Sequence, residues 1–395
     1  MSTAVSFIII ILVITVTFNV FYLTFFGVLS VFRSNKVKEG NKHLYKYGVM
    51  VIAYKNDKVI LESVTQNLLQ NYSKDKFDII VVGDGLLPET IATLKQMPLK
   101  IIELHLPYPT KANSIRETEN LLCNSDYDYV VLLDIDNVME VDFLKKLNNE
   151  IEKDIPLIQT HRMAKNLDTP IAILDAFSEE INNSIFRQGH QNIGLQTALI
   201  GSGIVFERQF FLSDILNIQA VGGYDKEIEL LLAKQKLKTK YCPTVNLYDE
   251  KTRFLDDLNK QRTRWFSAQF FYLRKNVLQS IYQMLFKGNI NYVNKILQFT
   301  LLPKIFTLVL CFIMPFITYF FYEPLFVLSV INAIAIIITA SISLPRKFYS
   351  MQYFSALQKL PLVFFSMVKG MTKLKGANRS FIATPHHTDE KENNK

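Results

Sequence analysis

Three long stretches of the sequence carry no charged side chain: residues 1–32, 305–322 and 324–345. A helix needs roughly 20 such apolar residues to cross the hydrocarbon core of a bilayer. We therefore predict one transmembrane helix at the N-terminus, too long to be a signal-peptide core, and two near the C-terminus. A very short link around Glu323 makes the rear pair an antiparallel hairpin. This pattern, with a mean hydropathy of +0.14, excludes a disordered, collagen-like or small disulfide-linked chain.

Basic side chains follow the first and the last apolar stretch. They are Arg33, Lys36, Lys38, Lys42 and Lys46 at the front, and Arg346, Lys347, Lys359, Lys369, Lys373 and Lys375 at the rear. Positive flanks mark the cytoplasmic side, so we expect a multi-pass protein of the inner cell membrane with its middle in the cytoplasm. Three widely spaced cysteines suit such a reducing compartment. We assign the net charge of +8 to contact with membrane lipids and not with nucleic acid, for which no module is recognised.

Between the anchors, short β-rich runs alternate with helical stretches. The runs are residues 48–54, 77–82, 100–104, 129–133 and 157–160, and the helical patterns include 57–70 and 111–122. This alternation predicts an α/β domain with a mostly parallel sheet, whose ligand-binding groups gather at the carboxyl ends of strands. We divide the chain into an N-terminal anchor (1–32), a basic linker (33–46), the α/β domain (47–255), interfacial helices (256–300), a transmembrane hairpin (301–345) and a basic amphipathic tail (346–395).

The strongest local motif is an apolar strand that ends in two acids, with the sequence Val-Val-Leu-Leu-Asp-Ile-Asp-Asn over residues 130–137. Asp134 and Asp136 are two residues apart, so on an extended backbone they point the same way. Hard divalent ions such as Mg²⁺ or Mn²⁺ prefer oxygen ligands and share them with phosphate groups. The motif therefore indicates either a metal site or two solvated acids that cap a turn.

Two other predicted strands also end in candidate site residues. Asp84 follows an apolar run and is flanked by glycines; its carboxylate could accept hydrogen bonds from a nucleobase or ribose, or it could be an ordinary turn residue. Ala53 and Tyr54 end the first strand, where a small residue beside an aromatic one could form a wall of a base-binding slot.

Two further motifs lie at predicted helices. Residues 222–225, Gly-Gly-Tyr-Asp, lead into an acidic helix start, which either supplies a general base or reflects the preference for acids near a helix N-terminus. Gln261, Arg264 and Trp265 share one helical face by their spacing. Arginine binds pyrophosphate in a forked geometry, and tryptophan stacks on sugars or lies at the membrane interface.

Five of these pieces, in this order, resemble the membrane-bound family 2 glycosyltransferases, which include cellulose, chitin and hyaluronan synthases and ceramide glucosyltransferase. The pieces are Ala53-Tyr54, Asp84, Asp134-Ile135-Asp136, Asp225 and Gln261-x-x-Arg264-Trp265. The resemblance covers residues 47–270, and the paired rear spans extend it. It implies a Rossmann-like nucleotide-diphospho-sugar transferase domain of the GT-A type, a nucleotide-sugar donor (expected to be a UDP-sugar), and Mg²⁺ or Mn²⁺ as cofactor.

The resemblance also implies a role for each residue. The residues implied to bind the donor are Ala53, Tyr54, Asp84, Lys111 and Asp134, and those implied to bind the metal are Asp134 and Asp136. The residues implied to contact the acceptor and the pyrophosphate are Gly201, Ser202, Gly203, Gln261, Arg264 and Trp265. The implied catalytic base is Asp225. We further expect residues 159–162 to lie beside the acceptor. The acids and amides of residues 175–183 are expected to form the polar side of a long helix.

Two departures from the family pattern bear on catalysis. Tyr224 stands where the family has glutamate before its catalytic aspartate, and Gly83 replaces the first acid of the usual pair. Shifting the motif by two residues makes Glu227 the alternative base. These departures keep open a second kind of function, that of a catalytically inactive, membrane-anchored subunit that binds nucleotide-sugar in a polysaccharide assembly complex.

The reaction that the resemblance implies is a single displacement at the cytoplasmic face. The base deprotonates an acceptor hydroxyl, which attacks the anomeric carbon opposite the nucleotide and inverts its configuration. The acceptor is a lipid or a polysaccharide. Three spans are few for a polymer channel formed by one chain, which favours a lipid acceptor or a pore built with partner proteins for export or assembly.

Overall fold

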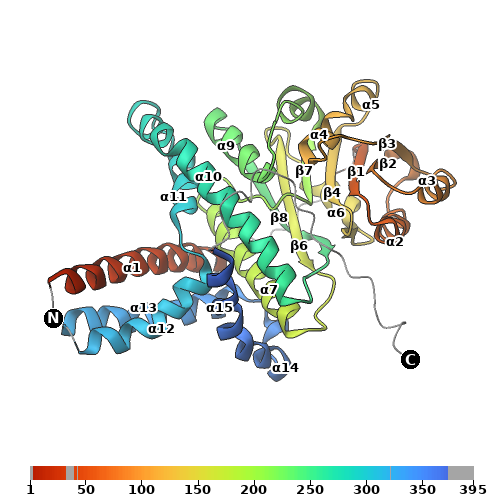
Figure 1. The fold of residues 1–395 in the computed structure, drawn as a ribbon. Helices are drawn as coiled ribbons and strands as arrows, with labels where there is room; N and C mark the ends of the chain where they lie inside the picture. The colour runs from red at the N-terminus through yellow and green to blue at the C-terminus, as the bar shows by residue number, and fades with distance from the viewer. Residues whose placement is uncertain (1–2, 33–39, 42, 321, 372–395) are drawn as a thin grey trace, which may run out of the picture.

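The computed structural model describes residues 3–32, 40–41, 43–320 and 322–371 (Figure 1). Its strands are β1 (Tyr47–Tyr54), β2 (Phe77–Asp84), β3 (Lys100–Leu104), β4 (Tyr129–Asp134), β5 (Val138–Met139), β6 (Leu157–Ala164), β7 (Ile204–Glu207) and β8 (Thr239–Asp249). The helices of the α/β domain are α2 (Asp57–Asn67), η1 (Lys74–Lys76), α3 (Pro88–Leu94), α4 (Lys111–Arg116), α5 (Glu119–Cys123), α6 (Phe143–Glu150), α7 (Pro170–Asn182), η2 (Asn183–Gly189), α8 (Arg208–Phe210), η3 (Phe211–Ile215) and α9 (Tyr224–Gln235).

The other helices are α1 (Thr3–Val31), α10 (Leu255–Lys287), α11 (Ile290–Thr300), α12 (Lys304–Tyr319), α13 (Glu323–Ser343), η4 (Arg346–Phe348), α14 (Met351–Phe354), η5 (Ser355–Lys359) and α15 (Leu360–Met371). Part of the orientation prediction depends on basic residues that lie outside the described part of the chain. They are Arg33, Lys36, Lys38, Lys42, Lys373 and Lys375.

The eight strands form one sheet in the order β3-β2-β1-β4-β7-β6-β8-β5. The pairs β1–β2, β2–β3, β1–β4 and β6–β8 are parallel, whereas β4–β7, β6–β7 and β5–β8 are antiparallel. The prediction of an α/β domain with a mostly parallel sheet is therefore confirmed, and each of the five predicted β-rich runs lies in a strand. Strands β5, β7 and β8 and the antiparallel pairings were not predicted.

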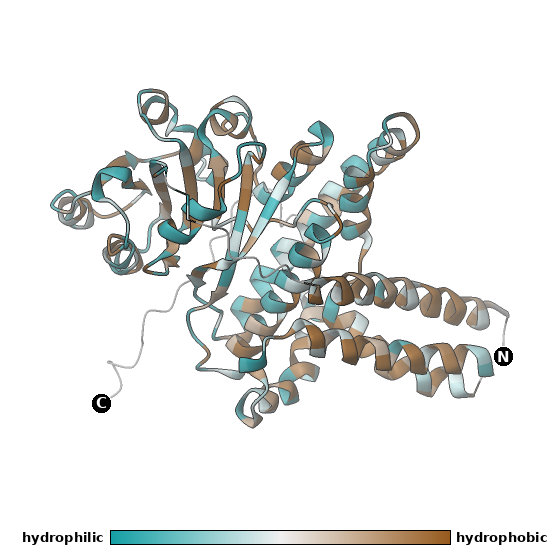
Figure 2. Ribbon diagram, turned by 180° about the vertical axis from the view of Figure 1, so that it is seen from behind, coloured by the Kyte–Doolittle hydropathy of each residue, from teal (hydrophilic) through white to brown (hydrophobic). Residues whose placement is uncertain are grey.

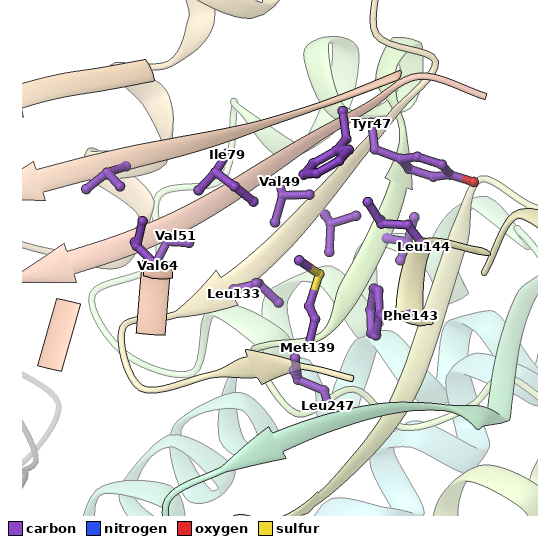
Figure 3. Close-up of a cluster of buried hydrophobic side chains, with 14 of the residues drawn as sticks. Tyr47, Val49, Val51, Val64, Ile79, Leu133, Met139, Phe143, Leu144 and Leu247 are labelled. Atoms are coloured by element: carbon purple, nitrogen blue, oxygen red, sulfur yellow. The ribbon is translucent and has the colours of Figure 1, made fainter. Parts of the chain in front are cut away.

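Both faces of the sheet are buried because successive strand residues are apolar. In β1, Val49 and Val51 belong to a core that also contains α2, α3 and α6, whereas Met50 points into a second core with α4, α5 and α9. Figure 3 shows the first of these cores, with Val49, Val51 and Leu133 side by side beneath the strands. A run without polar alternation is typical of such doubly covered strands.

The parallel register brings three polar strand ends to one edge of the sheet. Tyr54 of β1 pairs with Asp84 of β2, and Ile52 of β1 pairs with Asp134 of β4. Because parallel strands end at the same side, residues that are far apart in sequence meet there.

The membrane helices follow the apolar stretches. Residues 4–31 of α1 and 323–343 of α13 are each long and apolar enough to span a membrane, and α11 and α12 together form a pair bent by 63°. The bend falls next to Pro303, which cannot continue a helix from α11. Helices α12 and α13 form the predicted hairpin, and α1 runs beside them (Figure 1). Figure 2 shows that these helices are hydrophobic along most of their length.

The described part of the predicted amphipathic tail, residues 346–371, is broken into η4, α14, η5 and α15. Phe348, Ala356, Val363 and Met367 pack against α7 and α10. The opposite side of this segment exposes large apolar residues, among them Met351 and Phe365. Residues 372–382 lie outside the described part of the chain.

Candidate active site

A cavity of about 510 Å³ lies at the carboxyl ends of β1 and β4. Helices α4, α9, α10 and α11, the π-helix η2 and the segments 198–201, 220–223 and 249–253 contribute most of the rest of its wall. The predicted site residues that line the cavity are Tyr54, Lys111, Asp134, Asp136, Gly201, Asp225, Gln261, Arg264 and Trp265. Groups that are up to 211 positions apart in the sequence (54 to 265) therefore face one space.

The turn that carries the two acids is fixed by Asn137, which is completely buried. The side-chain oxygen of Asn137 accepts a hydrogen bond from the backbone N–H of Asp134 at 3.1 Å. Its amide nitrogen donates to Asp136 Oδ1 at 3.2 Å and to Asp249 Oδ1 at 3.0 Å. The second oxygen of Asp136 accepts from the backbone N–H of Glu250 at 3.2 Å. These bonds hold the backbone of Asp134 and the carboxylate of Asp136 in a defined position at the cavity.

Lys111 is bound to the first of these acids. Thr110 caps α4 by accepting a hydrogen bond from the N–H of Asn113 at 3.1 Å, which places Lys111 in the first turn of the helix. The Lys111 ammonium forms an ion pair with Asp134 and donates to the carbonyl of Gly201 at 2.7 Å. A cation at this position can stabilise phosphate oxygens that approach Asp134.

Of the two candidate bases, Asp225 faces the cavity and Glu227 does not. Gly223 precedes α9 with φ of 69°, a left-handed conformation that favours glycine, and it directs Asp225 into the cavity from the first turn. Lys226 Nζ lies 3.2 Å from Asp225 Oδ2 and 3.5 Å from Glu229 Oε2. Burial opposes the charged form of Lys226, but these two carboxylates outweigh it and raise the pKa of the lysine.

Helix α10 contributes Gln261, Arg264 and Trp265 to the opposite wall. Burial lowers the pKa of the Arg264 guanidinium from its ordinary value, while Asp134 and Asp225 act in the opposite sense. Arg264 thus lies within electrostatic reach of both the acidic turn and the candidate base. The Arg262 guanidinium stacks over the Trp265 ring at 4.3 Å and pairs with Asp175 of α7, which fixes the tryptophan at the cavity.

The remaining predicted site residues do not line the cavity. Ala53 is fully buried in the core because alternate residues of β1 point to opposite faces, and Tyr54 is the one that faces the cavity. Asp84 is also buried, and its Oδ1 accepts a hydrogen bond from the N–H of Leu106 at 3.1 Å. Ser202 and Gly203 lie behind the wall, where their carbonyls accept hydrogen bonds from Gln159. Their assigned roles stay predictions.

A group of charged residues beneath the cavity was missed by the sequence reasoning. We call Arg162, Glu179, Arg187, Asp249 and Lys251 the buried charge cluster, since each is at most 7% exposed. Glu179 meets Arg162 at 2.8 Å, Lys251 at 3.3 Å and Arg187 at 3.3 Å, and Asp249 meets Lys251 at 2.8 Å and Arg162 at 3.3 Å. The four members other than Glu179 line the cavity.

The acids on the predicted polar side of this helix are buried: Asp175, Glu179 and Glu180 of α7 are 4–6% exposed. Burial by itself would raise the pKa of Glu179, but the cations around it hold that pKa well below its usual range. In residues 159–162, Arg162 reaches the cavity, whereas His161 does not line it and pairs with Glu180 at 3.5 Å.

Asp134 and Asp136 are the residues that could hold a divalent metal ion. No cluster of three or more His, Cys, Asp or Glu side chains suited to a metal occurs among the described residues. Two carboxylates are nevertheless a fitting donor set for Mg²⁺ or Mn²⁺ when a diphosphate supplies further oxygens. The position of both acids at the cavity wall fits that arrangement.

Comparisons with known proteins agree with this geometry. The profile of the glycosyltransferase-like family 2 matches residues 45–268. Among solved structures, the chain is similar to a mannosyltransferase from Pyrobaculum calidifontis, solved in complex with GDP-Man and Mn²⁺. The TM-score is 0.59 at 13% identity, over 92% of this chain and 98% of that chain, which shows a common fold. No curated protein matches the chain significantly by sequence. Two or three helices among the described residues are long and apolar enough to cross a membrane. Because the family profile spans more than half of the chain, this protein belongs to the glycosyltransferase-like family 2 and is a glycosyltransferase.

Proposed function

We propose that the protein transfers a sugar from a nucleotide-sugar to a lipid acceptor at the cytoplasmic face of the inner cell membrane. The observation that carries this proposal is one continuous cavity. It joins the acidic turn, the candidate base Asp225 and Arg264 to a wall of α11, which contributes Gln298 and Phe299. Helix α11 is joined through its bend to the membrane helix α12, so the cavity ends next to the bilayer, where a lipid acceptor would arrive.

The donor end of the cavity suits a nucleoside diphosphate. Tyr54 offers an aromatic face, and Lys111 and Arg264 offer positive charge on either side of Asp134. When bound between Asp134 and Asp136, a divalent metal would offset part of the negative charge of the diphosphate. The similar mannosyltransferase was solved with GDP-Man and Mn²⁺, which supports a nucleotide-sugar donor and a metal of this kind.

In the proposed mechanism, Asp225 accepts the proton of the acceptor hydroxyl. The hydroxyl oxygen then forms a bond to the anomeric carbon as the bond to the diphosphate oxygen breaks, and the configuration inverts. Lys226 Nζ lies 3.2 Å from Asp225 Oδ2 and orients that carboxylate at the cavity. Arg264 stabilises the charge that develops on the leaving diphosphate. Trp265 provides an apolar surface on which a sugar ring can stack.

The charge distribution supports the proposed orientation and lipid contact. From Leu258 to Thr388 the sequence holds a single acid, Glu323, which lies at the turn between α12 and α13. The basic residues of this half therefore lie at the other end of the hairpin, as expected for the cytoplasmic side. The C-terminal part of α10, next to the turn into α11, exposes Leu278, Leu285 and Phe286 at 69–77%. We propose that this turn inserts into the cytoplasmic leaflet.

A donor and acceptor screen tests the proposal. The purified full-length protein in lipid nanodiscs is incubated with UDP- and GDP-sugars, Mg²⁺ or Mn²⁺, and membrane lipid extract, and both released nucleotide and labelled lipid are measured. We expect metal-dependent labelling of the lipid fraction that Asp136→Ala abolishes and Glu103→Gln, an exposed matched control, retains. Labelled product in the water-soluble polymer fraction would replace the lipid acceptor by a glycan. Absence of turnover with every donor would favour an inactive nucleotide-sugar-binding subunit.

A further inference from the structure

The N-terminal helix α1 is packed against the catalytic domain much more closely than an anchor requires. A methyl group added at Gly189 would lie 2.2 Å from the backbone oxygen of Phe26, so the last residue of η2 touches the backbone of α1 directly. The next residue, His190, stacks on the Phe26 ring with centroids 3.7 Å apart and planes inclined by 9°. Only glycine permits this approach at position 189.

Polar side chains connect the same two segments. The Tyr22 hydroxyl bonds His190 Nε2 at 2.9 Å and donates to Asn294 Oδ1 of α11 at 2.7 Å. The hydroxyls of Ser30 and Ser184 share a hydrogen bond of 2.6 Å. Such bonds specify one rotational position of α1, whereas a helix that only anchors the chain in lipid needs none.

The end of α1 is also capped by the catalytic domain. Asn192 donates from its side-chain amide to the carbonyls of Leu29 at 2.7 Å and Phe32 at 3.0 Å. A span of 28 residues is about 42 Å long, which exceeds the hydrocarbon core by about 12 Å, or roughly eight residues. The last two turns of α1 can therefore leave the hydrocarbon and meet η2 at the membrane surface (Figure 1).

The segment that α1 contacts forms part of the cavity wall. Phe186 and Arg187 of η2 both line the cavity. The carbonyl of Phe186 accepts a hydrogen bond from the N–H of Ala198 at 2.9 Å, and Arg187 Nε donates to the carbonyl of Ala198 at 3.2 Å. Ala198 opens the stretch 198–201, whose residues line the cavity and whose Gly201 carbonyl binds Lys111. An unbroken series of contacts thus leads from α1 to the cavity wall at residues 198–201.

We propose that α1 is a positioning element for sugar transfer. By packing on Gly189 and accepting hydrogen bonds from the Asn192 side chain, α1 fixes the position of η2 and residues 198–201. These two segments form the wall against which the acceptor lies. This inference rests on the proposed function, because it takes the α11-η2 end of the cavity as the acceptor side. The donor side is built by β1, β4 and α4, none of which is bonded to α1 in the part of the chain that the structure describes. Displacing η2 should therefore impair acceptor use and spare nucleotide binding.

The test compares Gly189→Ala and Asn192→Ala with Phe21→Leu, a control on the lipid-facing side of α1, where Phe21 is 67% exposed. All are assayed as full-length protein in nanodiscs, with transfer to lipid extract and affinity for UDP or GDP, whichever the wild type releases. Because an error of about 1 Å in reactant placement can cost about 100-fold in rate, we expect Gly189→Ala to lower kcat/KM for the acceptor at least 10-fold. Its nucleotide affinity should stay within about twofold, Asn192→Ala should show a smaller loss, and Phe21→Leu should show none.

The outcomes separate the inference from the proposed function. An inactive wild type would refute the proposed function. An active wild type with an equally active Gly189→Ala variant would refute the positioning role of α1. Parallel loss of transfer and nucleotide affinity in Gly189→Ala would also refute it, because α1 would then support the domain as a whole and not the acceptor wall.

Discussion

Replacing Glu179 with glutamine tests the energetic weight of the buried charge cluster beneath the cavity. Glu179 is 5% exposed and is surrounded by Arg162, Arg187 and Lys251. Glutamine keeps the shape of the side chain but removes its charge, which leaves three buried cations with Asp249 as the remaining acid of the cluster. Removing one partner of a buried ion pair costs about 3–5 kcal/mol, because the other charge stays buried without compensation.

This free energy converts into a measurable shift of the melting temperature. For a cooperative unit of roughly 200 residues, with an unfolding entropy of about 2.1 cal/mol/K per residue, a loss of about 3–5 kcal/mol lowers the Tm by about 7–12 °C. Thermal unfolding in detergent, followed by circular dichroism, measures the shift. The control is Glu62→Gln: Glu62 pairs with Lys165 at 2.7 Å but its side chain is 50% exposed. An exposed pair is worth about 0.2–1 kcal/mol, so the control should melt within about 2 °C of the wild type.

The pH dependence gives a second check on the same residue. The pKa of Glu179 is depressed in the folded protein, so its stabilising effect is complete above the unfolded value of about 4.3 and is lost as the pH falls toward the folded value. The difference in Tm between wild type and Glu179→Gln should therefore narrow below about pH 4.3. A Glu179→Gln variant that melts within 2 °C of the wild type at pH 7 would refute the reasoning.

Three further predictions concern catalysis and membrane contact. Asp225→Asn should lower kcat about 10²- to 10⁴-fold with little change in nucleotide affinity, whereas Glu227→Gln should stay near wild type in the same nucleotide-release assay; the reverse result would make Glu227 the base. Asp136→Asn should raise the Mn²⁺ concentration for half-maximal activity at least 10-fold, and an unchanged metal titration would exclude it as a ligand. A tryptophan at Leu285, but not one at the exposed Tyr108, should be quenched by brominated lipid tails in nanodiscs, and equal quenching at both positions would argue against insertion of the α10–α11 turn.

Strands and spans could be predicted from the sequence because their patterns are local. The run 130–133 is apolar on both strand faces, and the two acids that follow it fall at the sheet edge that the parallel register creates. Polar residues whose partners are distant could not be placed. The sequence pattern placed Glu179 on the polar side of a helix but could not show that this side is buried. The cations that surround Glu179 come from β6, η2 and the segment after β8, and no local pattern links them.

At the site, too, the sequence predicted where a motif lies but not which of its side chains faces the cavity. The motif around Ala53 and Tyr54 predicted the location of the strand end, but which of the two faces the cavity depends on the alternation of β1 within a doubly covered sheet. Likewise, the sequence motif favoured Asp225 as the base and left Glu227 as the alternative after a shift of two residues. Their different positions relative to the cavity arise from the direction in which Gly223 starts α9.

The polar side chains of α1 also constrain how the protein is made. During synthesis α1 enters the bilayer well before Ser184, His190, Asn192 and Asn294 have left the ribosome, since all of them lie more than 150 residues downstream. Until then, Tyr22 has neither of its two hydrogen-bond partners, and polar groups in this position are costly in lipid. Under the proposed membrane topology, insertion and domain folding are thus coupled in time: the inserted helix completes its hydrogen bonds only when the domain that emerges after it docks.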